Sequence, residues 1–243
     1  MMHPRYRKSH AATIAIAAVA CTTLGFVTSA AAIEPQSLWH CMNDALDDID
    51  WRTRVLNVLL PDSTSDTSFR CVVIPAFEPE WVIIADCEAD PSANLELRVA
   101  KENVWFANMV PMPAVGHRAV RGWSDSPVPI EIEVRQASLS SDTCLALRDL
   151  WSIVLKRRIH WAGGGVDGTE YVFFAGTGVN ESCGETWSPR DGTFLHRLVE
   201  VVDDLNHLAL DEDLLSRRKR DAQLRERAMR LTEDQLTRER KTK

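Results

Sequence analysis

The stretch from Ser140 to Leu210 constrains the fold most, because it contains two helix patterns with a strand pattern between them. In the first helix, the polar residues 140–142 offer N-caps and the glycines 163–165 provide an end. Its apolar residues recur at three- and four-residue steps, as on one face of an amphipathic helix: Leu147, Leu150, Trp151, Val154 and Leu155. A second helix, which begins after residues 191–193, repeats this pattern at Leu195, Leu198, Val202, Leu205 and Leu208, with Glu200, Asp203 and Asp204 facing away. Between the helices, Thr169 to Ala175 has apolar side chains on both faces, so we expect a strand that is covered on both sides or central in its sheet.

Strand patterns dominate the first half of the chain. Residues 71–74 and 81–84 are apolar runs joined by a proline-containing turn, which predicts a hairpin. Residues 95–99 and 130–134 alternate apolar with charged side chains, as half-buried strands do, and the prolines at 127 and 129 place the second of them at a sheet edge. We also expect a strand at 104–106, whereas residues 51–60 fit a helix or a strand.

Strands followed by a helix–strand–helix unit predict an α+β fold, with a mainly antiparallel sheet packed against the two amphipathic helices. We assign residues 33–210 to one domain, because the strand at 169–175 has too few strand neighbours of its own in the second half.

Residues 211–243 are rich in Arg, Lys and Glu and contain no Gly or Pro, which predicts a long charged C-terminal helix. Apolar residues recur there every seven positions, at Leu215, Ala222, Met229 and Leu236. The other core positions of a coiled coil are largely charged, so we expect a solvated helix. The alternative is a tail that binds a partner or anionic lipid.

The N-terminus has the three parts of a secretory signal peptide. Arg5, Arg7 and Lys8 are basic, residues 11–27 are apolar and small, and residues 29–32 offer a cleavage site. We therefore expect residues 1–32 to be removed and the mature chain to be periplasmic or secreted. The alternative is an uncleaved anchor.

A second alternative rests on four residues. Ala18-Val19-Ala20-Cys21 resembles a bacterial lipoprotein box, although Ala stands where Leu is usual, three residues before the cysteine. The resemblance implies lipid attachment at Cys21, which would tether the chain to an envelope membrane.

An exported chain meets an oxidising compartment, so its cysteines predict disulfides. The candidates are Cys71 with Cys87, and Cys144 with Cys183, which leaves Cys41 unpaired. None of the cysteines has CxxC spacing, so we expect no zinc site.

The predicted domain is strongly acidic. Residues 33–216 contain 30 Asp and Glu against 14 Lys and Arg, a net charge of −16, whereas the residues from Arg217 onward carry +6. Such a surface repels nucleic acid and anionic lipid and attracts cationic proteins. The alternative is that the charge serves solubility alone.

No motif predicts catalysis, a metal or a cofactor. The glycine-rich segments lack the phosphate-binding pattern, and neither a nucleophile elbow nor a zinc-binding H-E-x-x-H is present. Glu181 and Glu185, in a predicted loop with Trp187, are the nearest approach to paired carboxylates, which could serve glycoside hydrolysis. The alternative is a solvated acidic loop in which Trp187 packs into the core.

These observations favour an exported, non-enzymatic binding protein of the inhibitor or immunity kind. Its partner would be a basic exported protein, such as a toxin or a cell-wall hydrolase. We expect the binding surface to combine an acidic first helix with the loop around Glu185: Asp44, Asp47, Asp48, Asp50, Glu181, Glu185 and Trp187. The alternatives are an envelope glycan hydrolase that uses Glu181 and Glu185, and a lipid-anchored structural component.

Overall fold

The computed structural model describes residues 51–60, 69–87, 93–115, 118–123, 128–156, 168–176 and 182–241. All of them belong to the second of the two compact units into which the chain divides, residues 34–243. The predicted signal peptide, Cys41 and the acidic segment 44–50 lie outside the described residues. Within the described part of the chain, no helix is both long enough and apolar enough to cross a membrane.

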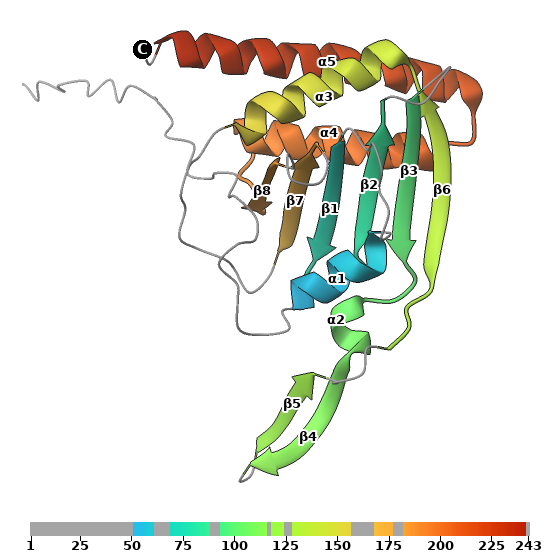
Figure 1. Cartoon of the computed structure of the whole chain (residues 1–243), viewed down its shortest axis with the longest axis vertical. Coiled ribbons are helices and arrows are strands. Elements are labelled where there is room, and N and C mark those ends of the chain that lie inside the picture. Colours follow the sequence, from blue (N-terminus) through green and yellow to red (C-terminus); the bar gives the residue numbers. More distant parts are fainter. Residues whose placement is uncertain are drawn as a thin grey trace, which may run out of the picture. The chain divides into compact units, whose positions relative to one another are not determined.

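A six-stranded antiparallel sheet forms the centre of this unit (Figure 1), in the order β6-β3-β2-β1-β7-β8. The strands are β1 (Phe69–Pro75), β2 (Trp81–Asp86), β3 (Ala93–Ala100), β6 (Ile132–Leu139), β7 (Thr169–Ala175) and β8 (Ser182–Trp187). As predicted, β7 has a neighbouring strand on each side, and β6 lies at an edge. The α+β class and the mainly antiparallel sheet are confirmed.

Helices cover both faces of the sheet. Three of them cover one face: α3 (Ser141–Leu155), α4 (Phe194–Leu210) and α5 (Leu214–Lys241). The β1 residues Cys71 and Val73 are buried in the core on that face. On the opposite face, Val72 is buried with Val55 of α1 (Trp51–Leu59). Residues 51–60, which fitted a helix or a strand, therefore contain a helix. This division follows from the alternation of side chains along a strand.

Side-chain caps fix where α3 and α4 begin. Ser140 Oγ accepts a hydrogen bond from the N–H of Thr143 at 3.3 Å, and Thr193 Oγ1 accepts one from the N–H of His196 at 3.1 Å. Each cap satisfies an N–H group that has no partner within its helix. The predicted starts of both helices are confirmed.

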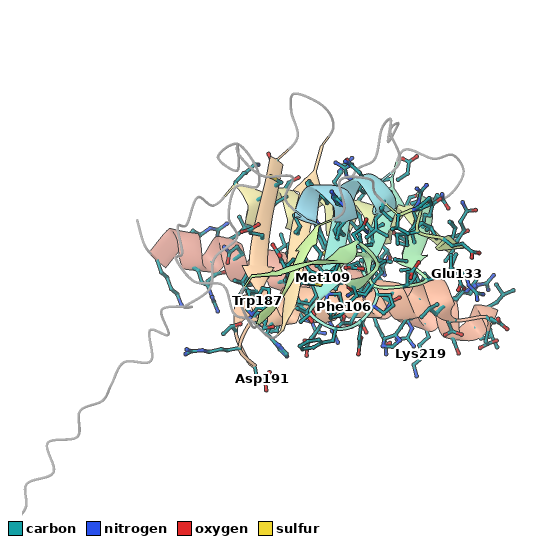
Figure 2. All side chains as sticks on the ribbon, turned by 90° about the horizontal axis from the view of Figure 1, so that it is seen from below. Phe106, Met109, Glu133, Trp187, Asp191 and Lys219 are labelled. Atoms are coloured by element: carbon teal, nitrogen blue, oxygen red, sulfur yellow. A yellow bond between two sulfur atoms is a disulfide. The ribbon has the colours of Figure 1, made fainter. Side chains whose placement is uncertain are left out.

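The segment after β3 is different from the prediction. Val104–Ala107 is a short helix, α2, because Asn103 Oδ1 accepts a hydrogen bond from the N–H of Phe106 at 3.0 Å and so caps a helical turn. The chain then forms β4 (Met109–Val115) and β5 (Arg118–Trp123), a separate hairpin that projects beyond α2 (Figure 1). Figure 2 shows Phe106 and Met109 on this end of the molecule.

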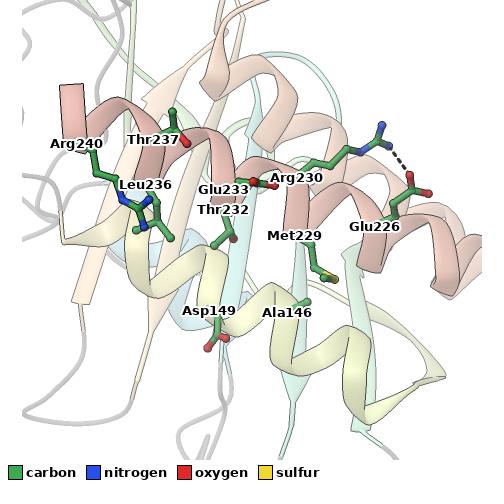
Figure 3. Close-up of a pocket in the computed structure, with 10 residues that line it drawn as sticks. All are labelled: Ala146, Asp149, Glu226, Met229, Arg230, Thr232, Glu233, Leu236, Thr237 and Arg240. Carbon is green, nitrogen blue, oxygen red and sulfur yellow. Dashed lines mark ion pairs between the residues drawn. The ribbon is translucent and has the colours of Figure 1, made fainter. Parts of the chain in front are cut away.

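The C-terminal helix α5 packs along α3 and α4 (Figure 3). Leu224, Ala228 and Leu231 are buried in the same core as the sheet residues beneath the helices. Their steps of four and three residues define the inner face of α5. The prediction of a long helix is therefore confirmed, but the expectation that it is solvated is wrong along this face.

Charge also joins α5 to the body. Arg227 Nη1 lies 3.0 Å from Asp204 Oδ2 of α4, and Arg225 Nη1 lies 3.1 Å from Asp142 Oδ2 of α3. The basic tail thus neutralises part of the acidic body within the same molecule. Over residues 33–243 the chain carries 35 acidic and 25 basic residues, a net charge of −10.

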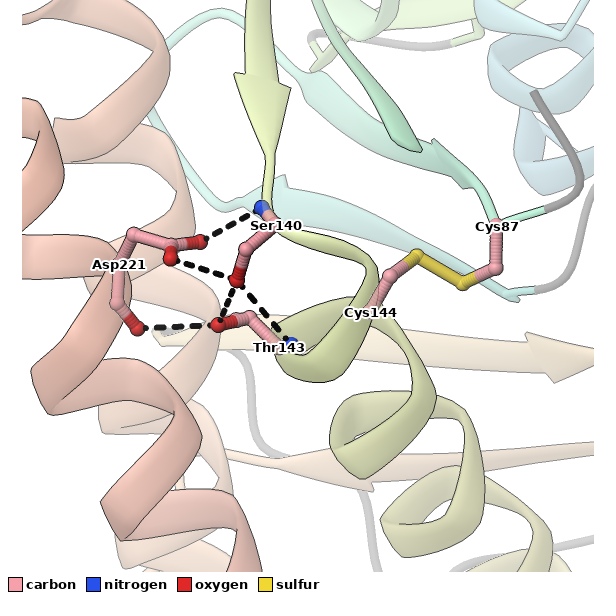
Figure 4. The surroundings of a disulfide bond; sticks show 5 residues. All are labelled: Cys87, Ser140, Thr143, Cys144 and Asp221. Atoms are coloured by element: carbon pink, nitrogen blue, oxygen red, sulfur yellow. Dashed lines mark hydrogen bonds between the residues drawn. A yellow bond between two sulfur atoms is a disulfide. The ribbon is translucent and has the colours of Figure 1, made fainter. Parts of the chain in front are cut away.

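The disulfide differs from both predicted pairings. Cys87, after β2, is bonded to Cys144 in the first turn of α3 (Figure 4). The pairings of Cys71 with Cys87 and of Cys144 with Cys183 are therefore wrong, and Cys71 is a buried thiol. Spacing along the chain did not reveal that the end of β2 meets the start of α3.

Next to the disulfide, α5 contributes a second cap to α3 (Figure 4). Asp221 Oδ1 accepts a hydrogen bond from the N–H of Ser140 at 3.1 Å, and Asp221 Oδ2 accepts one from the Ser140 hydroxyl group at 2.7 Å. The start of α3 is thus held covalently to β2 and by hydrogen bonds to α5.

Candidate functional site

Of the predicted binding residues, Glu185 and Trp187 lie within the described part of the chain. They are on strand β8 and not in a loop, and together with Cys183 they occupy alternate positions that share one face of the sheet. Asp44, Asp47, Asp48, Asp50 and Glu181 lie outside the described residues. The acidic first helix and the Glu181–Glu185 pair therefore stay predictions.

Trp187 lies at the end of the sheet where β1 turns toward β2. The N–H of Ala76, in that turn, donates a hydrogen bond to the carbonyl of Gly168 at 2.8 Å. Gly168 has a φ of +147°, and a Cβ there would lie 2.8 Å from Trp187 Nε1, so a larger residue would clash with the indole. The half-buried Trp187 is thus held next to the β1–β2 turn.

A buried carboxylate organises the same end of the sheet. Glu80 is fully buried, and its Oε2 accepts a hydrogen bond from the N–H of Val104, at the start of α2, at 2.8 Å. Burial raises the pKa of Glu80, and hydrogen bonds from the backbone N–H groups of α2 partly oppose the shift. Glu80 therefore fixes α2 against the sheet from within.

Two asparagines extend this network to the neighbouring segments. Asn103 Nδ2 donates to the carbonyl of Glu78 in the β1–β2 turn at 2.7 Å. Asn108 Oδ1 accepts a hydrogen bond from the N–H of Val128, before β6, at 3.0 Å. Because both asparagines are buried, these bonds are shielded from water and hold the three segments together.

The segments that these hydrogen bonds hold together carry exposed apolar side chains. Phe77 is 68% exposed, Phe106 45% and Val128 40%. The exposed carboxylates of the same three segments belong to Glu78, Glu102 and Glu131. We call these six residues the α2 surface: Phe77, Glu78, Glu102, Phe106, Val128 and Glu131. Apolar side chains within a polar rim are typical of protein-binding sites.

The α2 surface is negatively charged. Its neighbour Lys101 is bound to Glu131, with 2.5 Å between Lys101 Nζ and Glu131 Oε1, and this hydrogen bond raises the pKa of Lys101. Glu78 and Glu102 have no ion-pair partner among the described residues. Both carboxylates are exposed, so they can attract cations from outside the molecule.

A groove of about 500 Å³ between α3 and α5 is a second candidate (Figure 3). Its apolar lining consists of Ala146, Met229 and Leu236, and its charged lining consists of Asp149, Glu226, Arg230, Glu233 and Arg240. Arg230 Nη2 lies 3.6 Å from Glu226 Oε1, so these two charges compensate each other. Asp149 and Glu233 have no such partner within the part of the chain that the structure describes.

The other titratable groups that the structure describes do not form a site with catalytic geometry. His196 on α4 lies 3.7 Å from Glu200, one turn along the helix, and 3.6 Å from Asp191. Burial and the nearby Asp203 raise the pKa of the Cys71 thiol well above its usual value, so this cysteine is a poor nucleophile. Among the described residues, no group of three His, Cys, Asp or Glu side chains could hold a metal ion.

Sequence reasoning missed the α2 surface because it assigned 104–106 to a strand. Asn103 directly precedes the apolar residues 104–106, which is an N-cap pattern and a signal for the helix. Nothing in the sequence indicates that the β1–β2 turn and residue 128 meet at this helix. No protein-family model, curated protein or solved structure matches the chain.

Proposed function

We propose that this chain is an exported, non-enzymatic binding protein of the inhibitor or immunity kind. Its α2 surface would receive a basic exported protein, such as an envelope-acting toxin or hydrolase. The observation that carries the proposal is the set of three exposed apolar side chains, Phe77, Phe106 and Val128, among carboxylates.

The chemistry of the α2 surface supports such a partner. Aromatic side chains at the centre of an interface account for much of its binding energy, and Phe77 and Phe106 are exposed without further reorganisation. Glu78 and Glu102 would pair with Lys or Arg of the partner, and the net charge of −10 on residues 33–243 would speed the encounter. The rigid network beneath the surface reduces the entropy lost on binding.

Export is supported by the disulfide between Cys87 and Cys144, which is compatible with an oxidising compartment. The proposal therefore places both the chain and its partner outside the cytoplasm.

The test measures binding of the purified chain to the basic exported proteins encoded beside its gene. Phe106→Ala and Glu102→Lys should each weaken binding about tenfold or more. Glu212→Lys changes the net charge equally at another exposed position, and it should alter affinity by no more than about threefold. Raising the salt concentration should weaken binding of the unmodified chain.

Three results would count against the proposal: no basic exported protein binds at low salt, binding does not respond to salt, or Glu102→Lys and Glu212→Lys weaken binding equally. A far-UV spectrum of each variant shows whether its fold is intact.

A further inference from the structure

The helix α5 has two opposite faces with different surroundings. Its inner face, with Leu224, Ala228 and Leu231, is buried against the body. Its outer face has the seven-residue repeat, and there Leu215 is 74% exposed, Met229 59% and Leu236 38%. The outer face thus carries an exposed apolar row, of which Met229 and Leu236 also line the groove between α3 and α5.

Charged residues flank this row in a particular order. Arg218 and Lys219 lie toward the start of α5, and Glu233 lies toward its end. Asp149 of α3 lines the same groove as Glu233 (Figure 3). All four side chains are exposed, and none has an ion-pair partner among the described residues.

We propose that the outer face of α5 pairs with the same face of a second copy of this chain, with the two helices antiparallel about a twofold axis. The axis would pass between Arg225 and Glu226. Three contacts then share one midpoint along the helix: Leu215 with Leu236, Ala222 with Met229, and Arg218 with Glu233, each from one copy to the other. Apolar residues meet apolar residues, and the charged residues that meet are of opposite sign.

The order of the charges decides the direction of the pair. In a parallel arrangement each residue would meet its own equivalent, so Arg218 would face Arg218 and Glu233 would face Glu233. Like charges in direct contact are unfavourable, and reversing one helix converts both contacts into attractive ones. An isologous interface of this kind closes at two copies.

The groove between α3 and α5 adds a further contact of opposite charges between the two copies. Lys219 of the second copy would lie opposite Thr232, beside the two carboxylates Asp149 and Glu233 of the groove. The row from Leu215 to Leu236 is about 32 Å long at 1.5 Å per residue. Because its apolar part is narrow, the pairing depends on charge and should weaken with salt.

Charge reversal and charge exchange test this arrangement by sedimentation velocity over a range of concentrations, on the purified chain. Arg218→Glu and Glu233→Arg each place like charges opposite each other twice in the dimer, so each should weaken self-association about tenfold or more. The double variant Arg218→Glu/Glu233→Arg restores opposite charges and should return to within about threefold of the unmodified chain. Glu102→Lys on the α2 surface is the control and should leave self-association unchanged.

A chain that is monomeric at the highest soluble concentration in low salt would overturn the proposal. So would single reversals without effect, or a double variant that dimerises no better than the single ones. Far-UV spectra identify any variant that has lost its fold, and the neutral substitutions at the same positions, Arg218→Gln and Glu233→Gln, then replace it. The α2 surface is not part of this interface, so the outcome is separate from that of the proposed function.

Discussion

Leu231→Ala tests whether α5 is part of the folded body. Leu231 is 2% exposed and lies on the inner face of α5, in the core that covers the sheet. If α5 were a solvated tail, shortening the Leu231 side chain would not change the free energy of unfolding. If α5 is packed, the substitution leaves a cavity between α5 and the helices beneath it.

The size of the effect follows from the burial of Leu231. Removal of buried aliphatic groups costs their transfer free energy plus a term for the cavity, which gives about 2–5 kcal/mol for Leu→Ala. We expect about 3 kcal/mol, near the middle of that range, because Leu231 is almost fully buried in this core. Leu214→Ala is the matched control, since Leu214 is 68% exposed at the start of α5, and it should change stability by less than about 0.5 kcal/mol.

Urea unfolding followed by far-UV circular dichroism measures both variants at one low protein concentration. Leu231→Ala should lower the midpoint without changing the m-value. Equal stabilities of Leu231→Ala and Leu214→Ala would refute the packed arrangement, and so would an early transition of α5 alone in the unmodified chain.

Three further predictions concern stability. Removing the bond between Cys87 and Cys144 by Ser substitution should cost about 4 kcal/mol by the chain-entropy estimate for a separation of 57 residues, measured by urea unfolding. Asp221→Ala should cost about 1 kcal/mol, since Ser140 at the start of α3 loses two hydrogen bonds, and a melting curve that matches the unmodified chain would contradict this cap. Burial raises the pKa of Glu80 in the folded state above its unfolded value, so the unmodified chain should lose stability as the pH rises from the usual Glu pKa through the shifted one. Glu80→Gln cannot ionise, so a profile that keeps this loss would show that another group causes it.

The sequence predicted those elements whose pattern is local. The apolar periodicity of α3 and α4 reflects burial of one helix face, and the caps at Ser140 and Thr193 depend on residues only three positions away. The interior position of β7 in the sheet was also predictable from local pattern, because apolar side chains lie on both of its faces.

Features that depend on distant partners were not predictable. The stripe of α5 that is buried is Leu224, Ala228 and Leu231, yet the more regular seven-residue row is the exposed one, because α3 and α4 determine which side faces inward. The partner of Cys87 depends on where β2 ends relative to α3. The α2 surface likewise exists only because Glu80, Asn103 and Asn108 join segments that are separated in sequence.

Hydrogen–deuterium exchange on the complex tests the central claim, that a basic exported partner binds the α2 surface. With the partner bound, the peptides that contain residues 76–80 and 101–108 should exchange more slowly, whereas peptides of α4 should be unchanged. Two results would contradict the account: protection that is confined to α3, α4 and α5, or no protection at residues 76–80 and 101–108 when the partner is saturating.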